Sequence, residues 1–171
     1  MPRRLSVFLI AIAVFALDRW SKWLVETRFG PFDTKTVIPG LLNIVSSQNP
    51  GVAFGLFSES ASKGRTALLV IFSVSAVLIL GALLWRVDRP GSRGASRIDT
   101  LTAYGLACIF GGALGNVFDR VRYGTVTDFL DFYIGQTHWY TFNLADTAIC
   151  TGAGLLFLAM WKPSGGPLRA A

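Results

Sequence analysis

The chain has 171 residues, of which 52% are hydrophobic and 15% are charged, and its mean hydropathy is +0.50. Because about a quarter of the residues of an ordinary soluble domain are charged, this composition excludes a typical water-soluble fold and indicates a membrane protein. The net charge of +6 does not indicate a nucleic-acid partner, since no basic stripe is interleaved with aromatic residues on a soluble element.

Four nearly continuous apolar runs predict an α-helical membrane protein with four transmembrane helices in a single membrane-embedded domain, residues 1–171. Each run is long enough to cross about 30 Å of hydrocarbon at a rise of about 1.5 Å per residue. All five tryptophans lie at or beside the ends of the runs, where an amphipathic ring prefers the headgroup layer. The runs cover residues of about 5–24, 66–87, 100–118 and 142–161.

Basic residues set the expected orientation of these helices. They are concentrated at the two ends of the chain and in the loop at 88–99, so the positive-inside rule puts both termini and this loop in the cytoplasm. The two longer connections then face the extracytoplasmic side. The basic residues on which this prediction rests are Arg3, Arg4, Arg86, Arg89, Arg93, Arg97, Lys162 and Arg169.

The first run begins like a secretory signal peptide, with arginines followed by apolar residues. We interpret it instead as an uncleaved span, because the run continues through Trp20, Trp23 and Leu24. Asp18 and Lys22 lie four residues apart, on one helical face, as an intrahelical ion pair would. This polar face is expected to contact protein rather than lipid.

The first extracytoplasmic connection predicts a small β-sheet. Residues 36–46 contain β-branched and apolar residues on both sides of a Pro39-Gly40 turn signal. Asn49 follows, and its neighbours Pro50 and Gly51 favour a turn-forming role for it on sequence physics alone. The apolar residues 52–57 that come next are expected to rest on the membrane surface.

The third and fourth runs carry small residues that predict a close helix–helix contact. Gly111 and Gly115 have small-xxx-small spacing in the third run, and the fourth contains Ala145, Ala148 and Gly152. The connection between these runs must then fold back over their outer ends.

Asp146 lies about one turn into the fourth run, where an acid is a candidate functional residue and needs a partner. Asp119, Asp128 and Asp131 compete for that role. We interpret Asp119 and Arg120 as interfacial anchors that form ion pairs, and Asp131 as a solvated loop charge. Two carboxylates brought close together share a proton, so one can activate water while the other donates, as in aspartic proteases.

Other chemistries have little support. His138 is the only histidine, and no Cys and His run has zinc spacing, so we expect no metal and no other cofactor. A lone loop histidine is expected to be solvated. Cys108 and Cys150 are expected to be free thiols, because a bond buried in lipid has no obvious oxidant.

Five ordered motifs, which together span nearly the whole chain, resemble those of bacterial lipoprotein signal peptidase, also called signal peptidase II. Each motif alone is weak, but five in order on four apolar runs are specific. The motifs are Asp18-x-x-x-Lys22, Asn49-x-Gly51-x-Ala53-Phe54, Gly115-Asn116-x-x-Asp119-Arg120, Val126-x-Asp128-Phe129-x-Asp131 and Phe142-Asn143-x-Ala145-Asp146.

The resemblance implies an aspartic endopeptidase of the bacterial cytoplasmic (inner) membrane, with a small extracytoplasmic β-sheet and a short interfacial helix. Its partners would be membrane lipid and a diacylglyceryl-modified prolipoprotein cut before the lipidated cysteine, and we expect a monomer. Residues 53–57 would cover the lipidated cysteine as a lid. Asp128 and Asp146 would be the catalytic dyad, with Asp18 and Lys22 as a structural polar pair. Substrate-binding or supporting residues would be Asn49, Gly51, Ala53, Phe54, Asn116, Arg120 and Asn143.

Two functions from other classes also use acids or small-residue seams in membranes. A small proton-coupled transporter predicts an acid-lined path through the centres of the spans, whereas these acids gather at one face. A non-catalytic membrane assembly factor would use the small residues only to bind partners.

Overall fold

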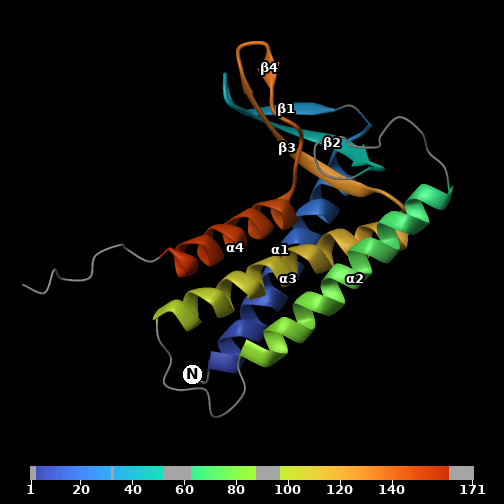
Figure 1. The fold of residues 1–171 in the computed structure, drawn as a ribbon. Coiled ribbons are helices and arrows are strands. Elements are labelled where there is room, and N and C mark those ends of the chain that lie inside the picture. The colour runs from blue at the N-terminus through green and yellow to red at the C-terminus, as the bar shows by residue number, and fades with distance from the viewer. Residues whose placement is uncertain (1–2, 32, 52–62, 88–96, 162–171) are drawn as a thin grey trace, which may run out of the picture.

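The computed structural model describes residues 3–31, 33–51, 63–87 and 97–161, and places a small β-sheet at one end of a group of long helices (Figure 1). Each of the four apolar runs forms a helix, as predicted. The elements in chain order are α1 (Arg3–Arg28), β1 (Thr34–Ile38), β2 (Leu42–Asn49), α2 (Lys63–Val87), α3 (Arg97–Tyr123), β3 (Val126–Ile134), β4 (Thr137–His138) and α4 (Leu144–Met160).

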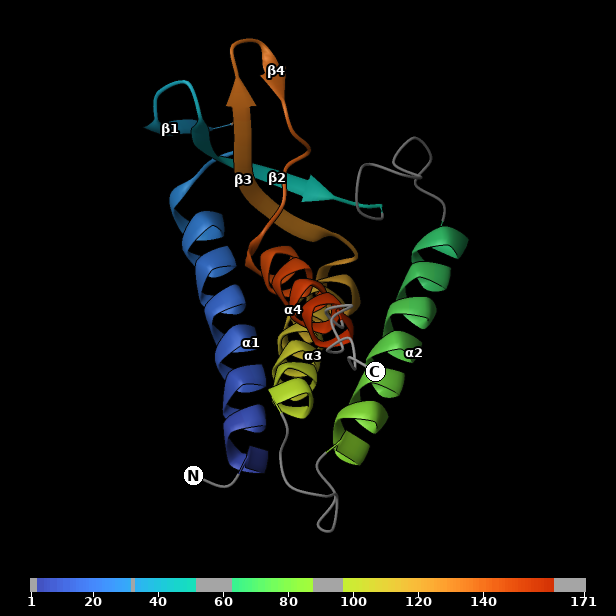
Figure 2. The ribbon, with the colours of Figure 1, turned by 60° about the vertical axis from the view of Figure 1, so that its left-hand side comes forward.

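The sheet is antiparallel, with strand order β1-β2-β3-β4. The predicted Pro39-Gly40 turn joins β1 to β2, and Gly40 adopts a φ of 79°, which favours glycine. The sequence predicts a loop for the connection from Asp119 to Thr141, so the strand β3 within it differs from that prediction. β3 begins beside the end of α3 and turns away from the helices toward its hairpin with β4 (Figure 2).

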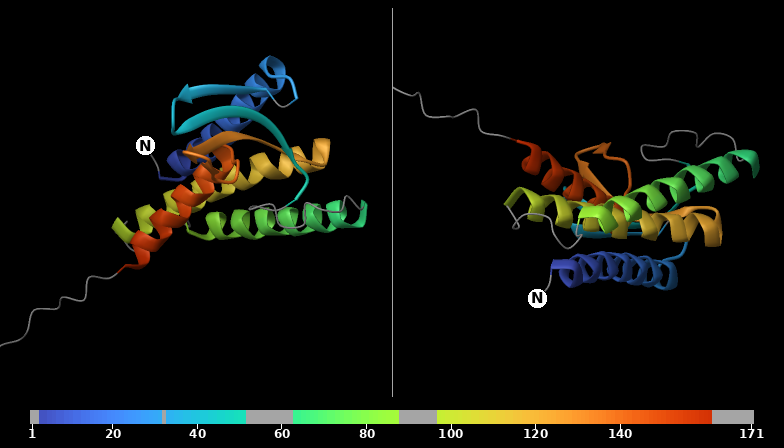
Figure 3. Two further views of the ribbon diagram at one scale, coloured as in Figure 1. Left: turned by 90° about the horizontal axis from the view of Figure 1, so that it is seen from above. Right: turned by 60° about the horizontal axis from the view of Figure 1, so that its bottom comes forward.

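Helix α3 is central: it contacts α1, α2 and α4 (Figure 3). The predicted seam between α3 and α4 is present, but it uses Gly105 and Gly112 of α3. A Cβ on Gly105 would lie 2.8 Å from the Gly152 carbonyl oxygen of α4. Gly111 instead faces α1, where its Cβ would lie 2.6 Å from the Ala11 carbonyl oxygen. Small residues on two faces of α3 therefore allow two neighbours to approach.

Two helical segments of the described residues, Ala67–Arg86 and Thr100–Tyr123, are long and apolar enough to cross a membrane, and Leu144–Met160 is a shorter apolar helix. Helix α1 carries Asp18, Arg19 and Lys22 in its C-terminal half. The short interfacial helix that the resemblance implies is not found within the described part of the chain, and residues 52–62 lie outside it.

Replacing Gly152 by alanine should destabilise the protein, by about 1–3 kcal/mol, because the added Cβ would lie 2.5 Å from the Gly105 carbonyl oxygen. The matched control is Gly154→Ala, two residues along the same helix, where an added Cβ meets nothing within 4 Å. That variant should keep or slightly raise the stability, because alanine is the better helix former. Thermal unfolding in detergent compares the two, and equal unfolding midpoints would contradict the packing argument.

Candidate active site

Polar side chains gather where the sheet meets the ends of α3 and α4. Asn143 is 0% exposed, Asp128 2% and Asn116 8%, so these groups lie out of contact with bulk solvent. Buried polar groups are costly unless they are hydrogen-bonded to one another. The hydrogen bonds among them therefore define how the site is built.

Asp128 lies on β3, opposite Ser47 of β2. Its Oδ2 accepts a hydrogen bond from the Nδ2 of Asn49 at 2.9 Å, and its Oδ1 accepts one from the Nδ2 of Asn143 at 2.7 Å. Asn49 also plays the turn-forming part expected of it, because its Oδ1 accepts a bond from the Gly51 amide at 2.9 Å. The two roles are combined in one side chain.

Asp146 lies in the first turn of α4 and forms a capping box with Asn143, the N-cap residue. The Asp146 amide donates to the Oδ1 of Asn143 at 3.0 Å, and the Asn143 amide donates to the Oδ2 of Asp146 at 3.2 Å. The Nδ2 of Asn116, on α3, donates to the Oδ1 of Asp146 at 2.8 Å. Asn143 thus touches both acids, which is how β3 and α4 bring them to one place.

Burial raises the pKa of Asp128 to about 6 from its ordinary 3.8. The hydrogen bond from Asn49 works in the opposite direction, and the charge of Asp146 raises the pKa further. The two carboxyl groups are therefore close enough to interact electrostatically. A pair of this kind holds one proton near neutral pH, which is the state suited to acid–base chemistry on water.

Arg120 links the site to the chain that follows β2. Its Nη2 donates to the Gly51 carbonyl oxygen at 3.2 Å, and its Nη1 donates to the Asn116 carbonyl oxygen at 3.3 Å. Ala53 and Phe54, two of the predicted site residues, lie outside the described residues, as does the lid expected at 53–57. The remaining predicted polar residues are all brought together.

The predicted Asp18–Lys22 ion pair is present at 2.9 Å and both side chains are fully buried. It belongs to a larger cluster, since Lys22 also contacts Asp119 of α3 at 2.8 Å and Asp119 pairs with Arg19. Asp119 therefore forms ion pairs as expected, but it is not an interfacial anchor: it is 0% exposed between α1 and α3. Gly115 makes room for Asp18, because a Cβ there would overlap its carboxylate.

Asp131 is not the solvated loop charge that was expected. It lies on β3, is 6% exposed, and accepts a hydrogen bond from the Nδ2 of Asn43 at 2.9 Å. The Nδ1 of His138 lies 2.9 Å from its Oδ1, so this histidine is paired rather than simply solvated. These contacts hold β2, β3 and β4 together.

A polar contact between α1 and β3 is not among the contacts predicted from the sequence. The Thr127 hydroxyl donates to the Oε1 of Glu26 at 2.6 Å and accepts from the Nε2 of Gln48 at 3.1 Å. A signal was available, because Glu26 continues the four-residue spacing of Asp18 and Lys22 along one face of α1. The polar face of α1 therefore extends to the sheet.

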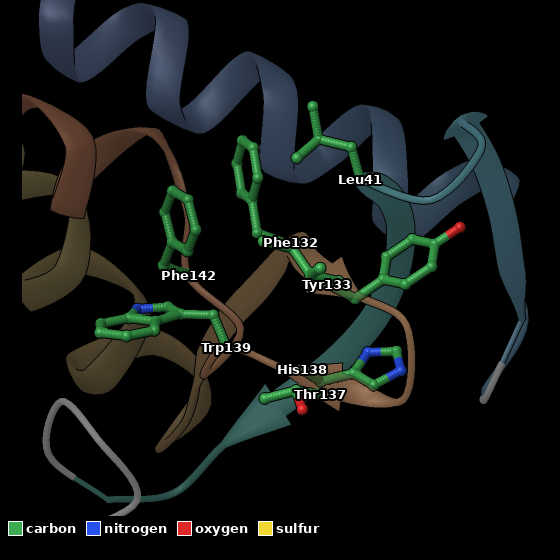
Figure 4. A pocket seen from close by; sticks show the side chains of 8 residues that line it. Leu41, Phe132, Tyr133, Thr137, His138, Trp139 and Phe142 are labelled. Carbon is green, nitrogen blue, oxygen red and sulfur yellow. The ribbon is translucent and has the colours of Figure 1, made fainter.

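An apolar cavity of about 420 Å³ lies on the sheet (Figure 4). Phe132 and Phe142 stack in it with ring centroids 5.7 Å apart. Phe142, which lines the cavity, directly precedes Asn143, so the cavity reaches the start of α4. The residues that line the cavity are Leu41, Phe132, Tyr133, Ile134, Thr137, His138, Trp139 and Phe142.

Within the described ranges no group of three or more His, Cys, Asp or Glu side chains is arranged to hold a metal ion. Cys108 and Cys150 are free, as predicted. What the site offers is two acids in contact with amide donors, next to an apolar cavity.

Comparison with known proteins gives consistent results. A family model described as signal peptidase (SPase) II matches residues 10–162. The lipoprotein signal peptidase of Solibacter usitatus is 47% identical over 160 residues, which cover 94% of this chain and 93% of that protein. The corresponding enzyme of Oleidesulfovibrio alaskensis is 41% identical, with 94% of this chain and 97% of that protein covered.

Two solved structures are similar in fold, and both are described as bacterial membrane enzymes determined by the in meso method. The one at 2.3 Å resolution has a TM-score of 0.73 and 31% sequence identity, with 91% of this chain and 87% of that chain covered. The one at 1.9 Å resolution has a TM-score of 0.72 and 29% identity, with 93% and 94% covered.

Replacing Asp128 by asparagine should change stability in a pH-dependent way. Because the pKa of Asp128 in the folded protein is about 6, above its ordinary 3.8, its ionisation lowers the free energy of unfolding of the wild type as the pH rises through this window. The stability of the variant relative to wild type should therefore grow by up to about 3 kcal/mol between about pH 4 and pH 8.

Thermal unfolding in detergent across this pH range measures the difference. Asp33→Asn, at an exposed position beyond α1, is the control for the loss of a carboxylate outside the site. If the difference in stability between Asp128→Asn and wild type does not change with pH, the raised pKa of Asp128 is contradicted.

Proposed function

The chain belongs to the signal peptidase II family and removes signal peptides from prolipoproteins; on that premise we propose that Asp128 and Asp146 are its catalytic dyad. The observation that carries this proposal is the Asn143 side chain, which bonds to Asp128 and caps the turn that holds Asp146. Asn143 holds Asp128 through its side chain and the Asp146 carboxylate through its backbone amide, which keeps the two residues close.

In the proposed reaction one carboxylate takes a proton from water as the water attacks the scissile carbonyl. The other, protonated, donates to the developing oxyanion or to the leaving amine. The burial that raises the pKa of Asp128 to about 6 supplies a group that keeps its proton to a higher pH than an ordinary aspartic acid does. No acyl-enzyme intermediate is required.

The proposed substrate is a prolipoprotein with a diacylglyceryl group on the cysteine that follows the scissile bond. A signal-peptide helix satisfies its own backbone, so a protease at the membrane edge must hold the scissile segment extended and replace those hydrogen bonds. Polar groups around the dyad are suited to this task, and the apolar cavity, which includes Phe142 next to Asn143, is suited to apolar parts of the substrate. The proposed binding or supporting residues are Asn49, Gly51, Ala53, Phe54, Asn116, Arg120 and Asn143.

The proposed setting is the bacterial cytoplasmic membrane, which α1, α2, α3 and α4 cross as one domain of residues 1–171, with both termini in the cytoplasm. The dyad then lies at the extracytoplasmic end, where the sheet covers the helix ends (Figure 1). This arrangement is favoured because the polar faces of α1 and α3 are turned toward each other, through Lys22 and Asp119, rather than toward lipid. We also propose that the chain acts as a monomer.

Asp128→Asn and Asp146→Asn should each lower the rate of cleavage by at least about 10²-fold, because each removes one partner in proton transfer. The measurement is cleavage of a purified diacylglyceryl-modified prolipoprotein by the detergent-solubilised protein. Asp33→Asn removes an acid outside the site and should cleave at the wild-type rate. Full cleavage by either dyad variant, with unfolding midpoints near wild type, would overturn the assignment.

A further inference from the structure

We propose that Lys22 is a positioning residue that acts through Asn116 to keep Asp146 as the ionised member of the dyad, leaving Asp128 to hold the proton. This inference rests on the proposed function, since it concerns how the dyad is set for reaction. The proposal gives the buried Asp18–Lys22 ion pair of α1 a role in the reaction at Asp146 of α4.

Lys22 is held in place by acids on two helices. Its Nζ lies 2.9 Å from the Oδ2 of Asp18 and 2.8 Å from the Oδ2 of Asp119. Both oxygens are buried and have no hydrogen-bond partner besides this ammonium contact. The other oxygen of Asp18 accepts from the Ala145 amide at 2.9 Å, so the cluster is also tied to the first turn of α4.

The third contact of Lys22 is the Oδ1 of Asn116, at 2.9 Å. An ammonium group has only donors, so its partner in the Asn116 amide must be the oxygen. The Nδ2 of Asn143 donates to the same oxygen at 3.2 Å. The Asn116 amide is therefore fixed in one of its two orientations, because the flipped amide would turn its NH₂ group toward two donors.

That orientation directs the Nδ2 of Asn116 at the Oδ1 of Asp146, 2.8 Å away. A donor aimed at a carboxylate favours its charged form. The Asn143 backbone amide supplies a second donor to the same carboxylate at 3.2 Å. Because Lys22 withdraws electron density from the Asn116 oxygen, the donor at the other end of that amide is strengthened.

The two acids differ in their surroundings. Asp128 is 2% exposed, and burial raises its pKa to about 6. Asp146 is partly exposed and lies at the N-terminal end of a helix, where negative charge is favoured. The buried acid therefore keeps the proton, and the acid with access to water is the base.

The other charged groups near the site do not favour ionisation of Asp146 over that of Asp128. Arg120 interacts with Asp146, Asp128 and Asp119 together, so it favours ionisation of both members of the dyad. Lys22 also lowers the pKa of Asp128 through space, as the smallest of the contributions at that residue. Arg19 and Glu26, on the same face of α1, are engaged with Asp119 and Thr127. Among these groups, the Asn116 amide connects Lys22 directly to Asp146, whereas it reaches Asp128 only through Asn143.

The test is the pH dependence of kcat for prolipoprotein cleavage. Lys22→Met should move the acid limb of the profile to higher pH by about one unit, because Asp146 then loses part of what keeps it ionised. Lys35→Met, the same substitution on an exposed residue of β1, is the control and should leave the profile unchanged. Since Lys22→Met leaves two buried acids without their cation, the profile is also measured for Asp18→Asn/Lys22→Met, which removes one charge of each sign.

The link through Asn116 has its own test. In an Asn116→Leu background, which lacks the connecting amide, adding Asp18→Asn/Lys22→Met should produce no further displacement of the acid limb. An additional shift of the same size would mean that Lys22 acts through space, and it would overturn the proposal. The proposal would also be overturned if Lys22→Met and Asp18→Asn/Lys22→Met both kept the pH profile of the wild type.

The dyad variants separate this proposal from the one on which it rests. If Asp128→Asn and Asp146→Asn are inactive while the Lys22 variants keep a wild-type profile, the dyad stands and only the role of Lys22 fails. If either dyad variant cleaves at the wild-type rate, the dyad itself is wrong.

Discussion

The site depends on the side chain of Asn143, whose amide oxygen and amide nitrogen are both hydrogen-bonded. Its Oδ1 caps α4 by accepting from the Asp146 amide, so its Nδ2 must point the other way, toward Asp128 and the Asn116 oxygen. A cap of this kind stabilises a helix by about 1 kcal/mol. The Nδ2 bond to Asp128 then ties β3 to the start of α4, so the geometry of the two acids follows from where this helix begins.

The sheet brings the chain back to the point where α4 begins. Phe142 and Leu130 exchange backbone hydrogen bonds at 3.1 Å and 2.8 Å, which pins the residue before Asn143 to β3. The rings of Tyr133 and His138 stack with centroids 5.2 Å apart, across the β3–β4 hairpin that returns the chain to α4. The position of Asn143 is therefore set by the ladder on β3, the strand that carries Asp128. One element places both halves of the site.

The sequence predicted the helices and the first hairpin well, because long apolar runs and a Pro-Gly turn are local signals. β3 was missed although Val126–Ile134 is rich in β-branched and aromatic residues, since Asp128 and Asp131 interrupt its apolar pattern. Sequence physics alone left Asp119, Asp128 and Asp131 as rival partners for Asp146. The choice depends on which helices and strands touch, and a contact such as Lys22 with Asp119, 97 residues apart by their numbers, has no local signature.

The same long-range contacts explain why so costly a site is tolerated. Keeping Asp128 buried opposes its ionisation by about 3 kcal/mol at neutral pH, and the Lys22 cluster places further charges where water is absent. Breaking one partner of a buried charge pair is strongly destabilising, so these charges favour a single arrangement of α1 against α3. Because that arrangement also orients the Asn116 amide, the charges that fix the packing of the helices are the charges that act on the dyad.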